Sequence, residues 1–255
     1  MAIVAVTGDA ATTTAVALAV SWPATDDVLL VEADPKGGDL AAWFDMPIAP
    51  SLSTVVTRVL DGSWPEVERL TRVSPVGLRV LPAPAGAAEA HQAVAESARS
   101  LVMTLASLRT PVVIADVGDV PTRADAHPFL GLASVAVLVH RQSTQSARAS
   151  AVRLQRLAEQ ITALNGAVPS IVLAVVGAVP FGPDEVAAFL SSDSADVTVL
   201  ALPNDPLAAA AMAGRTGVSA RRLARLPLMR SAQHLAGVID VELQSQLTGL
   251  WRAAR

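Results

Sequence analysis

Short apolar runs of strand length recur along this chain and are separated by stretches with helical periodicity. The seven runs lie at residues 2–6, 28–31, 78–81, 112–115, 134–139, 171–176 and 197–201. They are almost continuously apolar rather than alternating, which is typical of parallel strands covered by helices on both faces. The pattern therefore predicts an α/β fold built on one doubly wound, mostly parallel sheet of seven strands.

Helical spacing of apolar residues is clearest at 12–19, 87–108, 145–164 and 228–251. In the last of these, apolar residues recur every three or four positions from Leu228 to Leu250, and we expect Trp251 to close the packing of that face. The proline-rich segment 81–86 follows a strand and precedes a helix, which favours a loop at the sheet edge over a linker. No internal repeat is present, so we interpret residues 1–255 as a single domain.

The composition excludes several classes of protein. There is no cysteine, which rules out disulfides and thiolate metal sites and is typical of a reducing compartment. The net charge of −4, with 16% charged residues, favours neither a nucleic-acid binder nor an acidic tail. Every apolar run is shorter than the ~20 residues of a spanning helix, and the N-terminus lacks the pattern of a signal peptide. We therefore expect a cytoplasmic protein without an integral membrane span.

The first strand leads into a short loop and then a helix, which is the arrangement of a P-loop. Only Asp9, Ala10 and Ala11 separate Gly8 from the threonines that open the helix. A P-loop needs glycines whose N–H groups wrap phosphates, a lysine for the outer phosphates, and a Ser or Thr for magnesium. The chain's single lysine is Lys36, far from this loop. Asp9 stands where a phosphate would approach, and we expect its carboxylate to cap the helix instead.

Three further segments carry a resemblance to a known family. The second strand ends in the segment 29–40, LLVEADPKGGDL, which resembles the switch segment of the ParA/MinD family of deviant P-loop ATPases. The fourth run ends in Asp116-Val117-Gly118, which is similar to a Walker B strand. The segment 202–215 resembles the loop after the last strand of MinD- and CpaE-like proteins. All four segments occur in the family's order, and the chain looks most like short actinobacterial members with degenerate loops.

The resemblance implies a set of site residues at the carboxyl edge of the sheet. Magnesium would be held by Thr12, Asp34 and Asp116, and Asp34 would also be catalytic if ATPase activity is retained. Nucleotide contacts would come from the residues that match the family's loops, here regarded as vestigial: Gly8, Asp9, Thr12, Thr13, Lys36, Pro203 and Asn204. Because the loop is short and lacks its lysine, we expect no tightly bound cofactor and only weak binding of ATP with magnesium.

Five arginines define a second candidate site, here called the arginine cluster. No acidic residue lies between Asp205 and Asp240, while this stretch contains Arg215, Arg221, Arg222, Arg225 and Arg230. Such a surface suits a protein partner, and DNA is an alternative partner. No aromatic residue is interleaved with the arginines to stack bases, which favours the protein partner.

Taken together, these features predict a degenerate MinD/ParA/CpaE-like protein. We expect a non-catalytic or weakly nucleotide-responsive adaptor in a bacterial positioning, partitioning, secretion or pilus-assembly system, bound to itself or to an active relative. One alternative is an atypical ATPase in which Lys36 replaces the lost lysine. Another is a partition-type scaffold that binds DNA through the arginine cluster. A third is a dinucleotide-binding enzyme, because Glu32 follows Gly8 at about the 20-residue spacing of a ribose-binding acid.

Overall fold

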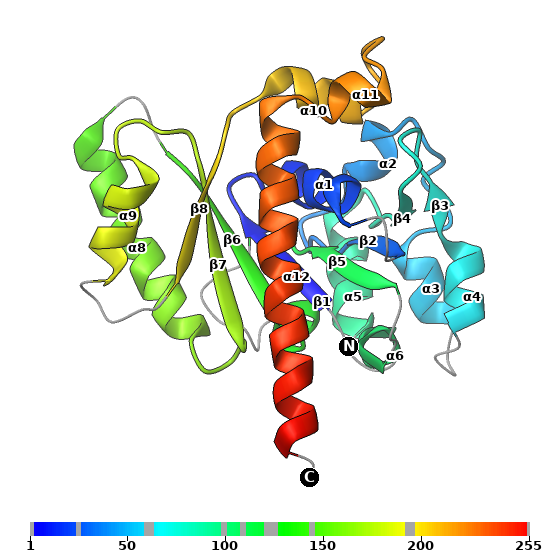
Figure 1. Ribbon diagram of the computed structural model, residues 1–255. Coiled ribbons are helices and arrows are strands. Elements are labelled where there is room, and N and C mark those ends of the chain that lie inside the picture. The colour runs from blue at the N-terminus through cyan, green and yellow to red at the C-terminus, as the bar shows by residue number, and fades with distance from the viewer. Residues whose placement is uncertain are drawn as a thin grey trace.

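The computed structural model describes residues 3–23, 27–58, 64–97, 101–107, 111–119, 127–142, 146–191 and 197–253, without the side chains of 103, 106, 107 and 249–253. Its strands form one sheet in the order β3-β4-β2-β5-β1-β6-β7-β8 (Figure 1). All neighbouring pairs are parallel except β3 and β4, which pair antiparallel. The doubly wound α/β architecture expected from the sequence is confirmed, with eight strands in place of seven.

The predicted apolar runs all form strands. The strand bounds are β1 Ile3–Gly8, β2 Val28–Glu32, β3 Arg72–Val73, β4 Arg79–Leu81, β5 Val112–Asp116, β6 Val135–Arg141, β7 Ser170–Val176 and β8 Thr198–Leu202. The additional strand is β3, which has only two residues, neither of them fully buried. A strand that is short and half-exposed has no apolar run in its sequence, so the hydrophobic pattern does not predict β3.

Helices connect the strands and cover both faces of the sheet (Figure 1). Their bounds are α1 Ala11–Ser21, α2 Leu40–Trp43, α3 Leu52–Arg58, α4 Trp64–Leu70, α5 Ala87–Ser97, α6 Leu101–Ser107, α7 Pro128–Gly131, α8 Ala147–Leu164, α9 Pro183–Ser191, α10 Pro206–Met212, α11 Ala220–Leu223 and α12 Pro227–Ala253. The predicted helix 87–108 corresponds to α5 and α6, with residues 98–100 and 108 outside the described part. The predicted packing of Trp251 also lies outside the described side chains.

Two apolar cores flank the sheet. Residues of one strand contribute alternately to the two, as Ile3 and Val4 show. One core joins the sheet to α3, α4, α5, α6, α7, α8 and α9, and the other joins it to α1, α2, α10, α11 and α12. Helix α1 is apolar on nearly all sides because it lies between the sheet and α12 (Figure 1). Its burial fixes the loop that precedes it.

The strand register places the carboxyl ends of the central strands together. Glu32 of β2 is the register partner of Asp116 of β5, and Gly8 of β1 is the partner of Val139 of β6. In open α/β sheets this edge is where ligands bind. None of the helices in the described part of the chain combines the length and hydropathy needed to cross a bilayer.

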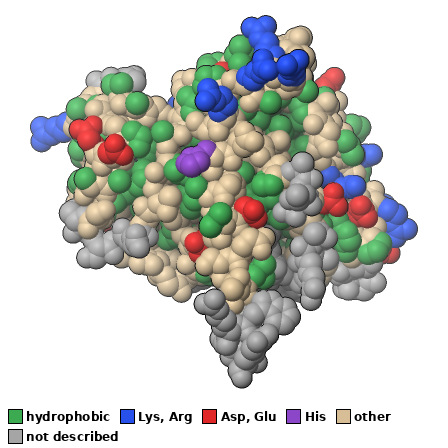
Figure 2. Space-filling view, in the orientation of Figure 1, with side chains coloured by type: hydrophobic (Ala, Val, Ile, Leu, Met, Phe, Trp, Pro, Cys, Tyr) green, Lys and Arg blue, Asp and Glu red, His purple; other side chains and the backbone are tan. Residues whose placement is uncertain are grey.

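The arginine cluster lies at one end of the molecule. All five of its side chains are exposed, and they come from the segment that contains α10, α11 and the first turn of α12. Figure 2 shows basic side chains gathered over α10 and α11.

Candidate functional site

The loop after β1 is tied to its neighbouring strands by its own backbone. The Gly8 N–H donates to the carbonyl of Gly118 at 3.0 Å, and the Asp9 N–H donates to that of Val139 at 3.1 Å. Gly8 has a φ of +117°, and a Cβ there would collide with the Val139 carbonyl, so the position requires glycine. These two N–H groups point to carbonyls and are therefore not offered to a phosphate.

Asp9 does not cap the helix, and that expectation was wrong. The N-cap of α1 is Ala10, and this helix start has no side-chain cap hydrogen bond in the described part of the chain. Asp9 Oδ2 instead accepts the N–H of Arg141 at 3.2 Å, at the end of β6. The Arg141 guanidinium donates in turn to Asn204 Oδ1 at 3.2 Å. Arg141 thus connects two of the predicted nucleotide contacts, and nothing in the sequence pattern pointed to it.

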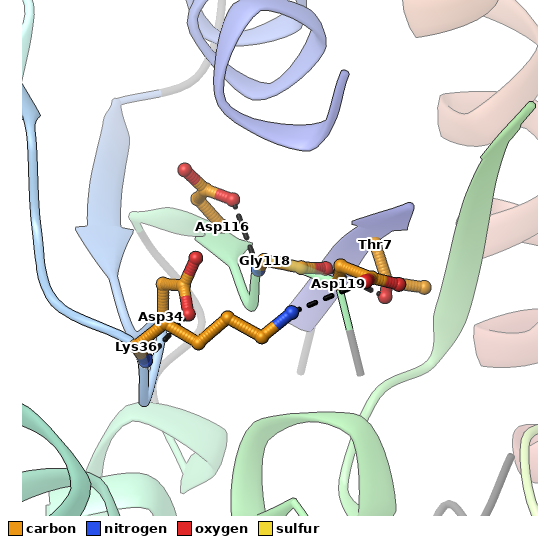
Figure 3. A network of polar contacts seen from close by, with 6 residues as sticks. All are labelled: Thr7, Asp34, Lys36, Asp116, Gly118 and Asp119. Atoms are coloured by element: carbon orange, nitrogen blue, oxygen red, sulfur yellow. Dashed lines mark hydrogen bonds and ion pairs between the residues drawn. The ribbon is translucent and has the colours of Figure 1, made fainter. Parts of the chain in front are cut away.

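The segment after β2 forms a compact turn around Asp34. The Lys36 N–H donates to Asp34 Oδ1 at 2.7 Å, and the Lys36 ammonium pairs with Asp119 Oδ2 at 3.1 Å (Figure 3). Both members of this ion pair are mainly exposed. The Asp34 carboxylate lies against Gly118, where a Cβ would collide with it and where φ is +66°. Partial burial raises the pKa of Asp34, and the Lys36 N–H and ammonium oppose that rise.

Asp116 is fully buried beneath this turn. Its Oδ1 accepts the Gly118 N–H at 3.2 Å, while Oδ2 has no hydrogen-bond partner among the described residues (Figure 3). Burial raises the pKa of Asp116 to about 6, a rise that the nearby Thr12 hydroxyl and the Gly118 N–H reduce and Asp34 adds to. The Thr12 side chain favours the charged carboxylate, although it forms no hydrogen bond with Oδ2. A buried carboxylate with one unpaired oxygen is costly to maintain.

Glu32 has a structural role that excludes the ribose-binding one. Its carboxylate is buried and accepts three backbone N–H groups: Oε1 from Asp39 at 2.7 Å and Leu40 at 2.9 Å, and Oε2 from Ala83 at 2.9 Å. Burial raises the pKa of Glu32 to about 7, and the N–H donors oppose the rise. The carboxylate is occupied in joining two loops, so the dinucleotide-enzyme alternative loses the residue on which it rested.

A cavity of about 400 Å³ marks the position where a P-loop would hold phosphates. Its walls are formed by Gly8, Asp9, Ala10, Ala11, Thr12, Thr13, Asp34, Gly118 and Asp119. Three of these residues are aspartates, and none of the described residues in the walls is cationic. The walls thus contain four of the predicted nucleotide contacts, Gly8, Asp9, Thr12 and Thr13, whereas Lys36, Pro203 and Asn204 are not part of them.

The residues present do not fit magnesium and ATP as a P-loop would hold them. Two loop N–H groups are taken by carbonyls, and the one lysine is paired with an aspartate. In the described part of the chain, no group of three or more acidic, histidine or cysteine side chains is arranged to hold a metal ion. The predicted set of Thr12, Asp34 and Asp116 supplies only two carboxylates, one of them sealed inside the protein.

A second cavity of about 310 Å³ lies beside the same loop, between β1, β6 and α8. His140 lines it with a buried Nε2 that has no partner among the described residues, and burial lowers the pKa of this imidazole. The exposed side chains of Arg153 and Arg156, three positions apart on α8, also line it. The sequence pattern did not point to these residues, and the three-residue spacing of the two arginines was the one available signal.

Comparison with known proteins identifies the fold. No protein-family model matches this sequence, and no curated protein matches it. A ParA family ATPase from Chlorobium tepidum TLS superposes with a TM-score of 0.65 at 15% identity, covering 92% of this chain and 97% of that one. A cobyrinic acid a,c-diamide synthase from Mycobacterium smegmatis, with bound ATP analogue and magnesium, gives 0.61 at 18% identity, covering 96% and 97%.

A third similar structure is the MinC:MinD cell division protein complex from Aquifex aeolicus. Its TM-score is 0.60 at 12% identity, covering 93% of this chain and 96% of that one. At such identities the likeness shows the fold alone. That fold is the one predicted from the switch segment and from the order of the four family-like segments along the chain.

Proposed function

Because this chain has the fold of the ParA- and MinD-type P-loop ATPases, we propose that it is a cytoplasmic, non-catalytic or weakly nucleotide-responsive adaptor. It would act in a bacterial positioning, partitioning, secretion or pilus-assembly system. One observation carries the proposal: the cavity at the phosphate position is walled by Asp9, Asp34 and Asp119, with no cation among its described residues. A site that binds a triphosphate needs the opposite charge.

The electrostatic balance at this cavity opposes a nucleotide. A unit negative charge about 4 Å from a phosphate charge costs about 1 to 4 kcal/mol, depending on the effective dielectric. The N-terminus of α1 offers an anion only about 0.3 to 1 kcal/mol in return. The Lys36 ammonium is the nearest cation in this turn, and it is neutralised by Asp119. The repulsion from the aspartates thus exceeds the attraction from the helix N-terminus, which opposes the binding of Mg-ATP.

An adaptor acts through its surface, and the proposal therefore includes a protein partner. The similar MinD structure was determined in complex with MinC, so this fold is able to present a protein-binding face. The partner would be a second copy of this chain or an active relative, and the arginine cluster is the surface best suited to an acidic one.

Calorimetric titration tests the nucleotide part of the proposal. The full-length protein is titrated with ATP, ADP and GTP in the presence of magnesium, and phosphate release is followed in parallel. We expect no binding in the micromolar range and no release above the background. Micromolar binding together with steady phosphate release would refute it. A pull-down from the native cell, repeated with and without ATP, then measures whether partner binding is independent of nucleotide.

The arginine cluster supports a second candidate function, a scaffold that binds DNA without sequence preference. A gel shift at low and at moderate salt tests it, because phosphate contacts weaken as salt rises. The variant with Arg221, Arg222 and Arg225 changed to Gln should lose the shift. The matched control changes three exposed arginines of α8, Arg148, Arg153 and Arg156, to Gln. Absence of a shift at low salt rules this function out.

A further inference from the structure

The two edges of the sheet are protected unequally against pairing with another chain. Of the described strands, β3 pairs only with β4 at one edge, and β8 pairs only with β7 at the other (Figure 1). The strand β3 has two residues and contains Arg72, whose guanidinium donates to the Ala49 carbonyl at 2.8 Å. Short edge strands and charged side chains both prevent pairing with a second chain. The strand β8, Thr198–Leu202, has five residues with no charge and no proline, so it lacks these protections.

The side chains of β8 are those of an interior strand. Val199 packs against the core that contains α8 and α9, and Leu200 packs against the core that contains α12. Both side chains are only partly buried. A strand that is apolar on both faces is typical of the middle of a parallel sheet, whereas β8 lies at the edge. The sequence of β8 therefore suits a strand with a neighbour on each side.

An open groove extends the apolar surface beside this edge. It lies between β7, β8 and α12 and has a volume of about 490 Å³. Thr198, Val172, Val238 and Val241 lie in its walls, and Val241 is 70% exposed. A strand added to β8 would therefore bury apolar side chains as well as pair with the backbone.

The backbone of β8 is complementary to that of an identical strand. The Leu202 carbonyl accepts the Gly177 N–H at 3.0 Å, so the polar groups of Leu202 point toward β7. These groups alternate in direction along a strand, so those of Leu200 also point toward β7, while those of Val199 and Ala201 point outward. When two such strands lie antiparallel about Leu200, each Val199 is opposite the other copy's Ala201. Each of these pairs can exchange two hydrogen bonds.

We propose that two copies of this chain form a symmetric dimer in which their β8 strands pair antiparallel and join the two sheets into one. The two-fold axis passes beside Leu200, so the two Leu200 side chains cover each other. A second copy fits because the outward groups match about this axis and because neither strand brings a charge to the contact. The short, charged β3 edges end the assembly at two copies.

This dimer is independent of the phosphate position. None of the described residues of β8 lies in the walls of the cavity beside Asp34. The dimer should therefore form without nucleotide, and it does not rest on the adaptor function proposed above.

Cysteine cross-linking tests the register of the pairing, because the chain has no cysteine of its own. Opposite residues of a non-hydrogen-bonded antiparallel pair have Cα atoms about 4.5 Å apart, a distance that a disulfide spans. Leu200→Cys should therefore form a disulfide-linked dimer under mild oxidation. The control is Thr198→Cys, at an exposed position of the same strand. Its two copies would lie about 13 Å apart along the strands and should not cross-link.

Sedimentation equilibrium of the full-length protein without nucleotide measures the dimer directly. We expect a reversible dimer whose fraction rises with concentration. Ala201 is exposed, so its substitution should keep the fold. Ala201→Pro removes an outward N–H from each copy, and Ala201→Lys places a charge on the edge. Each should weaken dimerisation by about tenfold or more. Ala201→Val keeps the N–H and should dimerise like the wild type, and circular dichroism verifies that each variant is folded.

Several results would overturn the proposal. They are a wild type that is monomeric at every concentration, a Leu200→Cys variant that cross-links no faster than Thr198→Cys, and folded Ala201→Pro and Ala201→Lys variants that dimerise like the wild type. A dimer that requires ATP would also overturn it, because that dimer would use another surface. The two proposals fail separately, since ATP hydrolysis by a nucleotide-independent dimer would refute the adaptor function and leave this pairing supported.

Discussion

Replacing Asp116 by Asn should make the stability of the protein less dependent on pH. The Asp116 carboxylate is fully buried, Oδ1 accepts one N–H, and Oδ2 has no partner among the described residues. Burial raises its pKa from the ordinary 3.8 to about 6. Asparagine preserves the shape and the acceptor that Gly118 uses but removes the charge.

The size of the effect follows from the shift in pKa. A rise of about two units, at about 1.4 kcal/mol each, means that the ionised carboxylate costs the folded state about 3 kcal/mol at neutral pH. Between the two pKa values the folded protein binds more protons than the unfolded one, so stability falls as the pH rises through this window. Asp116→Asn should therefore gain about 3 kcal/mol relative to the wild type between about pH 4 and pH 7. Any fixed cost of packing the amide cancels from this difference.

Urea unfolding followed by circular dichroism measures the prediction at a series of pH values. The control is Asp45→Asn, which removes one exposed charge at a φ of 51° that asparagine tolerates. It should stay within about 0.5 kcal/mol of the wild type throughout. If the free-energy difference between Asp116→Asn and the wild type is the same at every pH, the carboxylate has an ordinary pKa and the description of a sealed, unpaired group is wrong.

Three further outcomes follow from other contacts. Lys36→Ala breaks an ion pair that is 63% and 68% exposed, so urea unfolding should show a loss below about 1 kcal/mol. Phosphate release should remain at background in both proteins, whereas wild-type hydrolysis that this variant abolishes would establish Lys36 as a substitute lysine. Glu32→Gln places an amide N–H₂ against one of three N–H donors and should cost about 1 to 3 kcal/mol of unfolding free energy, with Glu159→Gln as the exposed control. His127 is buried, and its imidazole hydrogen-bonds to the Ala33 carbonyl at 2.8 Å. Burial lowers the pKa of this ring to about 4, so the ring is neutral at pH 7. Its imidazole resonances should titrate near this lowered pKa in an NMR series, and stability due to this group should be lost as pH falls below its ordinary 6.5.

Most of the fold could be predicted from hydrophobicity alone. The central strands are buried on both faces, so their sequences are continuous apolar runs that stand out without any structural information. The antiparallel strand β3 could not be found in this way, because it has two residues and contributes little to either core. Short helices such as α2, with four residues, are likewise too brief to show a period.

The location of the candidate site could be predicted from the sequence, but the contacts between its side chains could not. Strand ends fixed the positions of Gly8, Asp34 and Asp116 at one edge. The partner of Asp9 depends on how far the end of β6 extends beside the loop, and the pairing of Lys36 with Asp119 joins positions 83 residues apart. Such contacts depend on tertiary packing. The one local signal of the Glu32 contacts is Gly38, where a Cβ would collide with the Glu32 carboxylate.

The three hydrogen bonds accepted by Glu32 bear on how this protein meets its surroundings. They fasten the chain that follows β2 to the loop that follows β4, so the segment resembling a switch is held at both sides before any ligand arrives. A switch segment works by adopting two conformations. A segment held by these hydrogen bonds is restricted to one of them. The segment is therefore preorganised. A partner that binds here loses little affinity to the ordering of this chain, so the fit between the two surfaces sets the affinity.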